Sequence, residues 1–203
     1  MNLNPSNFLG GGLLQTVFII PTIVAAILIL AAGRKEDDAN RTQMRYVGTI
    51  GIVTLFITLW AFYRLVTALS TFIVKNHGPG NPILRSATNS LLLLLAAGAV
   101  FVYHKRRAKV LSPAGGFAKT GTGAAARATL YGVCFVAAII ALFAAARAVY
   151  GILVLIMPGI YGGGGDTGHV RSVGIADFVT FGALAGASVL IFLRSWNWLP
   201  EHK

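Results

Sequence analysis

Residues 128–157 read ATLYGVCFVAAIIALFAAARAVYGILVLIM, and Arg147 is the only charged side chain among them. A helix needs about 20 consecutive apolar residues to cross the hydrocarbon core of a bilayer. This stretch exceeds that length, and water-soluble domains of ordinary composition do not contain such runs. We therefore expect a transmembrane helix here.

Four further apolar runs lie on either side of this stretch, at residues 13–32, 46–74, 87–104 and 173–193. The chain of 203 residues is 56% hydrophobic and 11% charged, whereas average soluble domains are about 25% charged. Helices are required because bare backbone polar groups are too costly in hydrocarbon, and no alternating barrel pattern is visible. The predicted fold class is an all-α integral membrane protein with five transmembrane helices.

Lysine and arginine residues are distributed unevenly between the two sides of these runs. One side carries Arg34, Lys35, Arg41, Arg45, Lys105, Arg106, Arg107, Lys109, Lys119, Arg127, Arg194 and Lys203, and the other carries Lys75, Arg85 and Arg171. Because cytoplasmic loops carry the excess of positive charge, we predict a multi-pass protein of the cell membrane with its N-terminus outside and its C-terminus in the cytoplasm. Topology thus accounts for the net charge of +11, and no nucleic-acid partner is predicted.

The sequence also predicts an internal repeat, against the alternative that membrane helices look alike because they share Leu, Ala and Val. Residues 59–66, LWAFYRLV, align without a gap with residues 142–149, LFAAARAV, so that Arg64 falls on Arg147. Both units begin and end on the cytoplasmic side, so the repeats are parallel, and parallel repeats are related by an axis along the membrane normal. We expect an N-terminal helix within 1–33, two-helix repeats at 34–107 and 128–203, and a cytoplasmic linker at 108–127. The repeats form a four-helix core.

This arrangement resembles a class of small, uncharacterised bacterial polytopic membrane proteins assembled from two-helix units. The likeness covers residues 45–195. It rests on the paired arginine-bearing helices and on the return helix ending VYHKR at residues 102–106. The resemblance implies membrane architecture and carries over no catalytic residues.

Charged side chains inside the apolar runs are the first candidate site. Arg64 and Arg147 each have small residues on the same helix face, which lets another helix approach closely and predicts that both arginines face protein. Asp177 is the only acid within a run. We expect it to pair with one arginine, since a lone charge costs about 2.5–3.5 kcal/mol at the helix centre. The arginines are interpreted either as contacts for a lipid phosphate, a quinone carbonyl or another anion, or as structural residues. The small neighbours are Ala61, Ala68, Ala144 and Gly151.

Two further features call for an interpretation. Gly182 and Gly186 give a flat helix face, which we expect to pack on a helix of this chain or of a partner.

His104 is the candidate ligand for a pigment or haem. The simpler interpretation is that it is an interfacial histidine beside Lys105. The spacing of the four histidines matches no metal motif, and the glycine clusters lack the residues of a phosphate loop.

No grouping of nucleophile, base or paired carboxylates is apparent, so an enzyme is not expected. Three functions remain. The first is an accessory or structural subunit of a larger membrane complex, respiratory or photosynthetic, whose partners are other membrane-protein subunits and lipids. The second is a small transporter or channel with an outer vestibule that attracts anions. The third is a pigment-, haem- or quinone-binding protein. A bound phospholipid is expected, and no other cofactor is predicted.

Overall fold

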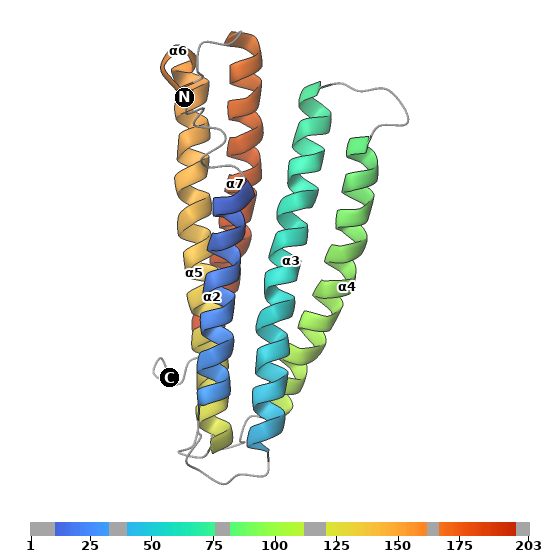
Figure 1. The fold of residues 1–203 in the computed structure, drawn as a ribbon, viewed down its shortest axis with the longest axis vertical. Coiled ribbons are helices and arrows are strands. Elements are labelled where there is room, and N and C mark those ends of the chain that lie inside the picture. Colours follow the sequence, from blue (N-terminus) through green and yellow to red (C-terminus); the bar gives the residue numbers. More distant parts are fainter. Residues whose placement is uncertain (1–10, 33–39, 76–81, 112–120, 162–166, 198–203) are drawn as a thin grey trace.

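The computed structural model describes residues 11–32, 40–75, 82–111, 121–161 and 167–197, and every element within these ranges is a helix. The chain forms an elongated bundle of nearly parallel long helices (Figure 1). The elements are α2 (Gly11–Ala31), α3 (Arg41–Lys75), α4 (Pro82–Leu111), α5 (Gly121–Ile156), the short α6 (Pro158–Tyr161) and α7 (Thr167–Trp196).

Four of these helices are long and apolar enough to cross a membrane, and α2 adds a shorter apolar helix, Val17–Ala31. Much of their surface is made of exposed aliphatic side chains, for example Leu92 and Leu95 on α4. A soluble bundle would bury such side chains, whereas lipid tails accommodate them. The structure is therefore compatible with a helical membrane protein. The four candidate spans are Arg41–Ile73, Ile83–Leu111, Thr122–Ile156 and Thr167–Trp196.

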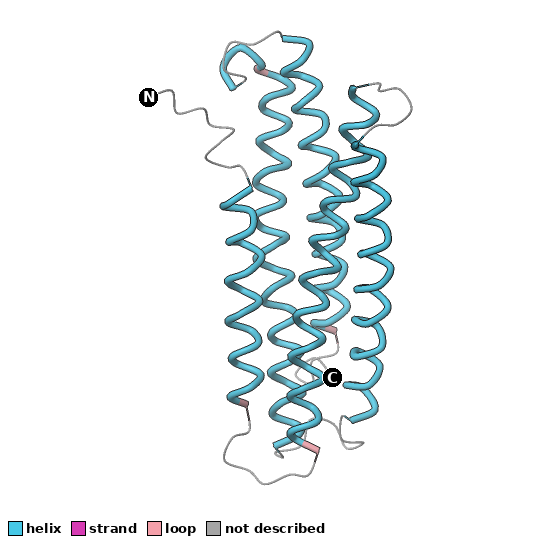
Figure 2. Tube along the Cα trace, turned by 45° about the vertical axis from the view of Figure 1, so that its right-hand side comes forward, coloured by secondary structure: helices cyan, strands magenta, loops and turns pink. Residues whose placement is uncertain are grey.

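The long helices form two antiparallel hairpins, α3 with α4 and α5 with α7, which stand side by side (Figures 1 and 2). Helix α3 also packs on α5 and α7. Helix α2 runs nearly parallel to the hairpins and packs against α3 of one and α5 of the other (Figure 1). Helix α4 packs mainly along α3, and near its end Ala108 and Leu111 also pack against the buried cluster of Met44, Ala125 and Ala126. The core therefore lies between α2, α3, α5 and α7, where Phe18, Leu55, Ile140 and Leu184 are fully buried.

The backbones of α5 and α7 approach each other closely at Gly151 and Gly174. A Cβ atom built on Gly151 would lie 2.8 Å from the backbone nitrogen of Phe178 and 2.9 Å from the carbonyl oxygen of Gly174. Only glycine permits backbones to approach so closely. This contact holds the second hairpin together.

The helices extend beyond the apolar runs expected from the sequence. Helix α4 continues past 104 to Leu111, and α5 begins at Gly121, ahead of 128. The linker expected at 108–127 is therefore helical at both of its ends. Hydropathy marks only the part of a helix that lies in hydrocarbon, whereas the hydrogen-bonded backbone continues into polar surroundings.

Positive charge collects where α3 and α5 begin and where α4 and α7 end, which we call the basic end (the lower end in Figure 1). At this end Arg45 donates hydrogen bonds to the Ala32 carbonyl, from its Nε at 2.8 Å and also from Nη2. These bonds join Ala32, the residue directly after α2, to the first turns of α3. Among the described residues the one carboxylate side chain, Asp177, lies toward the opposite end.

Candidate functional site: a charged pair between α5 and α7

Arg147 of α5 and Asp177 of α7 form an ion pair within the second hairpin. The arginine Nη2 donates to the Asp177 Oδ2 at 2.7 Å, and the two side chains are only 15% and 27% exposed. The pairing expected for Asp177 is thus present with Arg147. A hydrogen-bonded carboxylate and guanidinium compensate each other's charge and can remain together in a largely apolar bundle.

Aromatic rings surround the arginine of this pair. The guanidinium carbon of Arg147 lies 5.1 Å from the ring centroid of Tyr150 and 5.2 Å from that of Phe181. Phe181 in turn lies 5.6 Å from the ring of Tyr63 on α3. Cation–π contacts at these distances stabilise a positive charge that is removed from water. The ion pair joins α5 to α7, and the contact of Phe181 with Tyr63 extends this cluster to α3.

A small polar cavity of about 210 Å³ borders the carboxylate between α3 and α7. Asp177 contributes to its wall, and the hydroxyl groups of Ser70 and Thr180 are joined by a hydrogen bond of 2.9 Å across the two helices. His169 lies at its outer edge and is exposed. Sequence reasoning did not identify these hydroxyl residues, because isolated serines and threonines in an apolar run also bond to their own helix, as Ser70 does to Val66.

Arg64 does not take part in this site. Its side chain is exposed and lines a separate cavity of about 420 Å³ between α3 and α4, together with Arg85 and Asn89. The expectation that both arginines face protein is thus met only in part by Arg64, which faces α4 across the cavity but stays exposed. The reason is that this side of α3 is turned toward α4 and not toward Asp177 in the second hairpin.

The small residues near the two arginines are buried. Ala61 and Ala68 are 1% and 7% exposed, Ala144 is fully buried, and Gly151 makes the tight contact with α7 described above. These positions are thus packing positions. In α3 the buried alanines face the bundle, whereas Arg64 between them in the sequence does not.

Gly182 and Gly186 differ from this pattern. A Cβ atom built on either glycine would meet nothing within 4 Å, so within the described part of the chain no helix packs on this face. The expectation that Gly182 and Gly186 pack on another helix of this chain is therefore wrong. Gly174, about two turns before Gly182 in α7, makes the close contact with α5 instead.

His104 lies in α4 near the basic end. Its Nδ1 atom is 2.9 Å from the carbonyl oxygen of Val100, one turn earlier, and its ring is 6.4 Å from that of Tyr46. Within the described ranges no group of three or more potential metal ligands occurs. The other described histidine, His169, lies in the first turn of α7 at the opposite end, so among the described residues no second histidine lies near His104.

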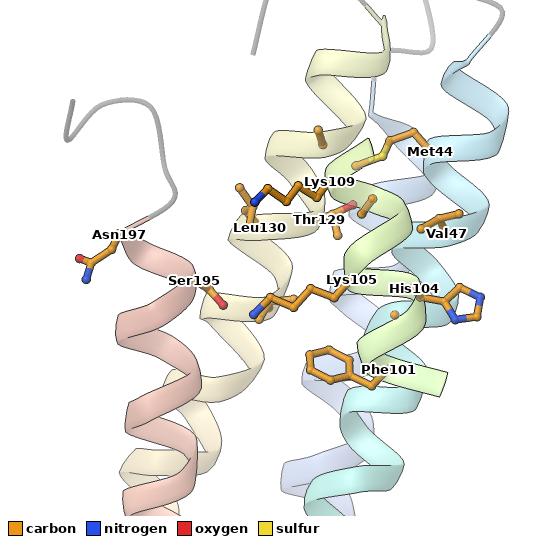
Figure 3. A pocket seen from close by; sticks show the side chains of 14 residues that line it. Met44, Val47, Phe101, His104, Lys105, Lys109, Thr129, Leu130, Ser195 and Asn197 are labelled. Atoms are coloured by element: carbon orange, nitrogen blue, oxygen red, sulfur yellow. The ribbon is translucent and has the colours of Figure 1, made fainter. Parts of the chain in front are cut away.

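A second large cleft, which sequence reasoning did not identify, lies at the basic end between α4 and the α5–α7 hairpin (Figure 3). Lys105 and Lys109 line it from α4. The only sequence signal was the spacing of these lysines, because residues four apart share a helix face.

Comparison with protein families, with curated proteins and with solved structures finds no match to this chain.

Proposed function

We propose that this chain is a non-catalytic accessory subunit of a larger complex in the bacterial cytoplasmic membrane. In this proposal all five apolar helices span the bilayer, with the basic end in the cytoplasm. The four long apolar helices and the positive charge at one end of the bundle support this placement. The respiratory and photosynthetic complexes are the host class that we infer.

The observation that supports the subunit role is a set of glycines with no other helix of the described chain packed against them. Gly182 and Gly186 on α7 and Gly98 on α4 each have open space where a Cβ atom would lie. In membranes, small residues mark the surfaces where helices of different subunits pack closely, since lipid gives no hydrophobic force between helices. Because no described helix of this chain covers these glycines, we propose that helices of other subunits do.

The two hairpins support the parallel repeat that is part of this proposal. In the second hairpin Arg147 meets Asp177, and in the first Arg64 shares a cavity with Asn89, the residue that aligns with Asp177. Gly98 and Gly186 also align in the two units.

Substitution of the α7 glycines tests the subunit role directly. Gly182→Leu combined with Gly186→Leu should leave the isolated chain folded, because both side chains would enter open space. The variant should lose most of its co-purifying membrane proteins after gentle solubilisation, as measured by quantitative mass spectrometry. Ile27→Phe, which adds bulk at an exposed site on α2, serves as the matched control.

Two outcomes would contradict the subunit role. One is an unchanged set of co-purifying proteins in the glycine variant. The other is migration of the wild-type chain only as a monomer or homodimer, in detergents that keep neighbouring complexes intact.

Thiol labelling tests the orientation in the membrane. Cys134 is buried and is the only cysteine, so a Cys134→Ser chain gives an unreactive background. A membrane-impermeant maleimide should label Thr167→Cys in intact cells, and Asn40→Cys only after permeabilisation, since these exposed residues lie at opposite ends of the bundle. The reverse pattern would overturn the predicted topology.

A further inference from the structure

The cleft at the basic end has a volume of about 420 Å³ and is formed by four helices. The first turns of α3 and α5 and the last turns of α4 and α7 meet there (Figure 3). It lies where α4, which packs mainly along α3, leaves space in front of α5 and α7. Its size lies in the range of sites that hold small ligands.

One part of the cleft is apolar. Phe101 of α4 and Leu130 and Val133 of α5 line it together with Met44 and Val47 of α3. Met44 and Val47 are buried against neighbouring helices, so this wall is fixed by packing. An apolar surface of this kind accommodates a hydrocarbon chain.

The other part of the cleft is cationic. The side chain of Lys105 reaches from α4 toward Ser195 of α7, and that of Lys109 reaches toward Leu130 of α5 (Figure 3). The ring of His104 turns away from the space between these helices. The Lys105 Nζ lies 6.0 Å from the Phe101 ring centroid, so the charge sits directly beside the apolar wall.

Further positive charge surrounds this cleft. Arg194 of α7 is close enough to repel Lys105 electrostatically. The described carboxylate, Asp177, lies toward the other end of α7. Several like charges at the mouth of an apolar cleft favour an occupant that is both anionic and amphiphilic.

We propose that this cleft binds an anionic phospholipid. Its phosphate lies between the ammonium groups of Lys105 and Lys109, and an acyl chain extends along Phe101, Leu130 and Val133. Basic pockets between transmembrane helices on the cytoplasmic side are suited to anionic headgroups. The inference rests on the membrane placement in the proposed function, and it does not depend on the subunit role.

Native mass spectrometry of the purified chain tests this site. The chain is stripped of lipid in a neutral detergent and then titrated with phosphatidylglycerol or with phosphatidylcholine of the same acyl chains. We expect one phosphatidylglycerol to be retained per chain and to raise the thermal unfolding midpoint, with phosphatidylcholine binding at least about tenfold more weakly.

Two double variants, each of which removes two positive charges from α4, are compared for lipid binding. Lys105→Gln with Lys109→Gln should weaken phosphatidylglycerol retention at least about tenfold. Arg106→Gln with Arg107→Gln removes two exposed charges from the same helix turns outside the cleft, and should have little effect. Equal losses in the two variants would overturn the proposal, because binding would then follow surface charge alone.

Two further measurements separate the lipid from a soluble anion. Leu130→Phe narrows the apolar wall and should weaken retention while both lysines remain. Inorganic phosphate or glycerol 3-phosphate, which lack acyl chains, should leave the unfolding midpoint unchanged at the lipid's effective concentration. Stabilisation by phosphate equal to that by phosphatidylglycerol would overturn the lipid assignment. Because all measurements use the isolated chain, a failed search for partner subunits leaves this result unaffected.

Discussion

Gly151→Leu is expected to disrupt the hairpin of α5 and α7 and to leave little folded protein in detergent. The Cβ atom alone would lie 2.8 Å from the backbone nitrogen of Phe178 and 2.9 Å from the carbonyl oxygen of Gly174. Backbone atoms cannot turn aside as a flexible side chain can, so the two helices must separate. Gly151 should be among the least replaceable positions of the described chain.

The expected loss of stability is large because the contact is equally tight at Gly174. A Cβ atom on Gly174 would likewise lie 2.9 Å from the carbonyl oxygen of Gly151 and 3.0 Å from the nitrogen of Leu155. Overpacking a well-filled core costs about 1–3 kcal/mol and sometimes more, and here the obstructing atoms are backbone. We expect a loss of about 3 kcal/mol or more for either glycine, with Gly151→Ala less severe than Gly151→Leu.

The measurement compares Gly151 of α5 with two glycines of α7 that look alike in sequence, Gly174 and Gly182. Fluorescence-detected size exclusion and thermal unfolding should show aggregation of Gly151→Leu and Gly174→Leu, whereas Gly182→Leu elutes as the wild type. The difference arises because a Cβ atom on Gly182 meets nothing within 4 Å. Similar behaviour of Gly174→Leu and Gly182→Leu would contradict the packing described above.

This pair of glycine sites illustrates what the sequence determines. Residues 128–157 and 173–193 predict apolar helices because the length and composition of a span are set locally. Which face of each helix meets its neighbour is a separate matter. In a soluble helix the polar side identifies the buried side, whereas lipid is as apolar as the protein core, so the pattern in α7 does not distinguish Gly174 from Gly182.

The charged residues were more predictable than the packing faces. Asp177 is the only acid in a span, and the high cost of a lone charge in lipid required a partner, which the structure supplies as Arg147. Whether Arg64 or Arg147 would be that partner was left open. The choice depends on α7 packing beside α5 and on the isolated position of α4, which are long-range contacts that no local pattern encodes.

The cleft at the basic end was unpredictable for the same reason. In the sequence Lys105 and Lys109 indicate the cytoplasmic side, and their spacing places them on one face of a helix. The space in front of them arises from the distance between α4 and the second hairpin. A cavity is a property of how helices are placed, and it leaves no pattern within any one of them.

Arg147→Leu is the second substitution with a large expected effect, and it should cost more than Asp177→Leu. Removing the arginine leaves a carboxylate only 27% exposed without its partner at 2.7 Å. Removing the aspartate instead leaves a guanidinium that retains the rings of Tyr150 and Phe181 at 5.1 and 5.2 Å. Breaking a buried ion pair by removing one partner costs about 3–5 kcal/mol, and partial exposure lowers this toward about 3 kcal/mol.

The double variant distinguishes a paired charge from a merely bulky side chain. Arg147→Leu with Asp177→Leu should be more stable than Arg147→Leu alone, because no unpaired charge then remains among the helices. The coupling between the two sites should be about 1–3 kcal/mol in a double-mutant cycle. Arg147→Lys should retain part of the stability, since an ammonium group on a flexible chain can still reach Asp177 or water.

Equilibrium unfolding in mixed micelles of dodecyl sulfate and a neutral maltoside supplies the four free energies of unfolding that the cycle needs. Arg64→Leu serves as the control, because Arg64 aligns with Arg147 in the sequence yet is exposed beside Asn89 and away from Asp177. Its effect should stay within about 0.5 kcal/mol, as at other exposed positions. Additive losses for Arg147 and Asp177, or an equal loss for Arg64, would show that the ion pair does not hold α5 and α7 together.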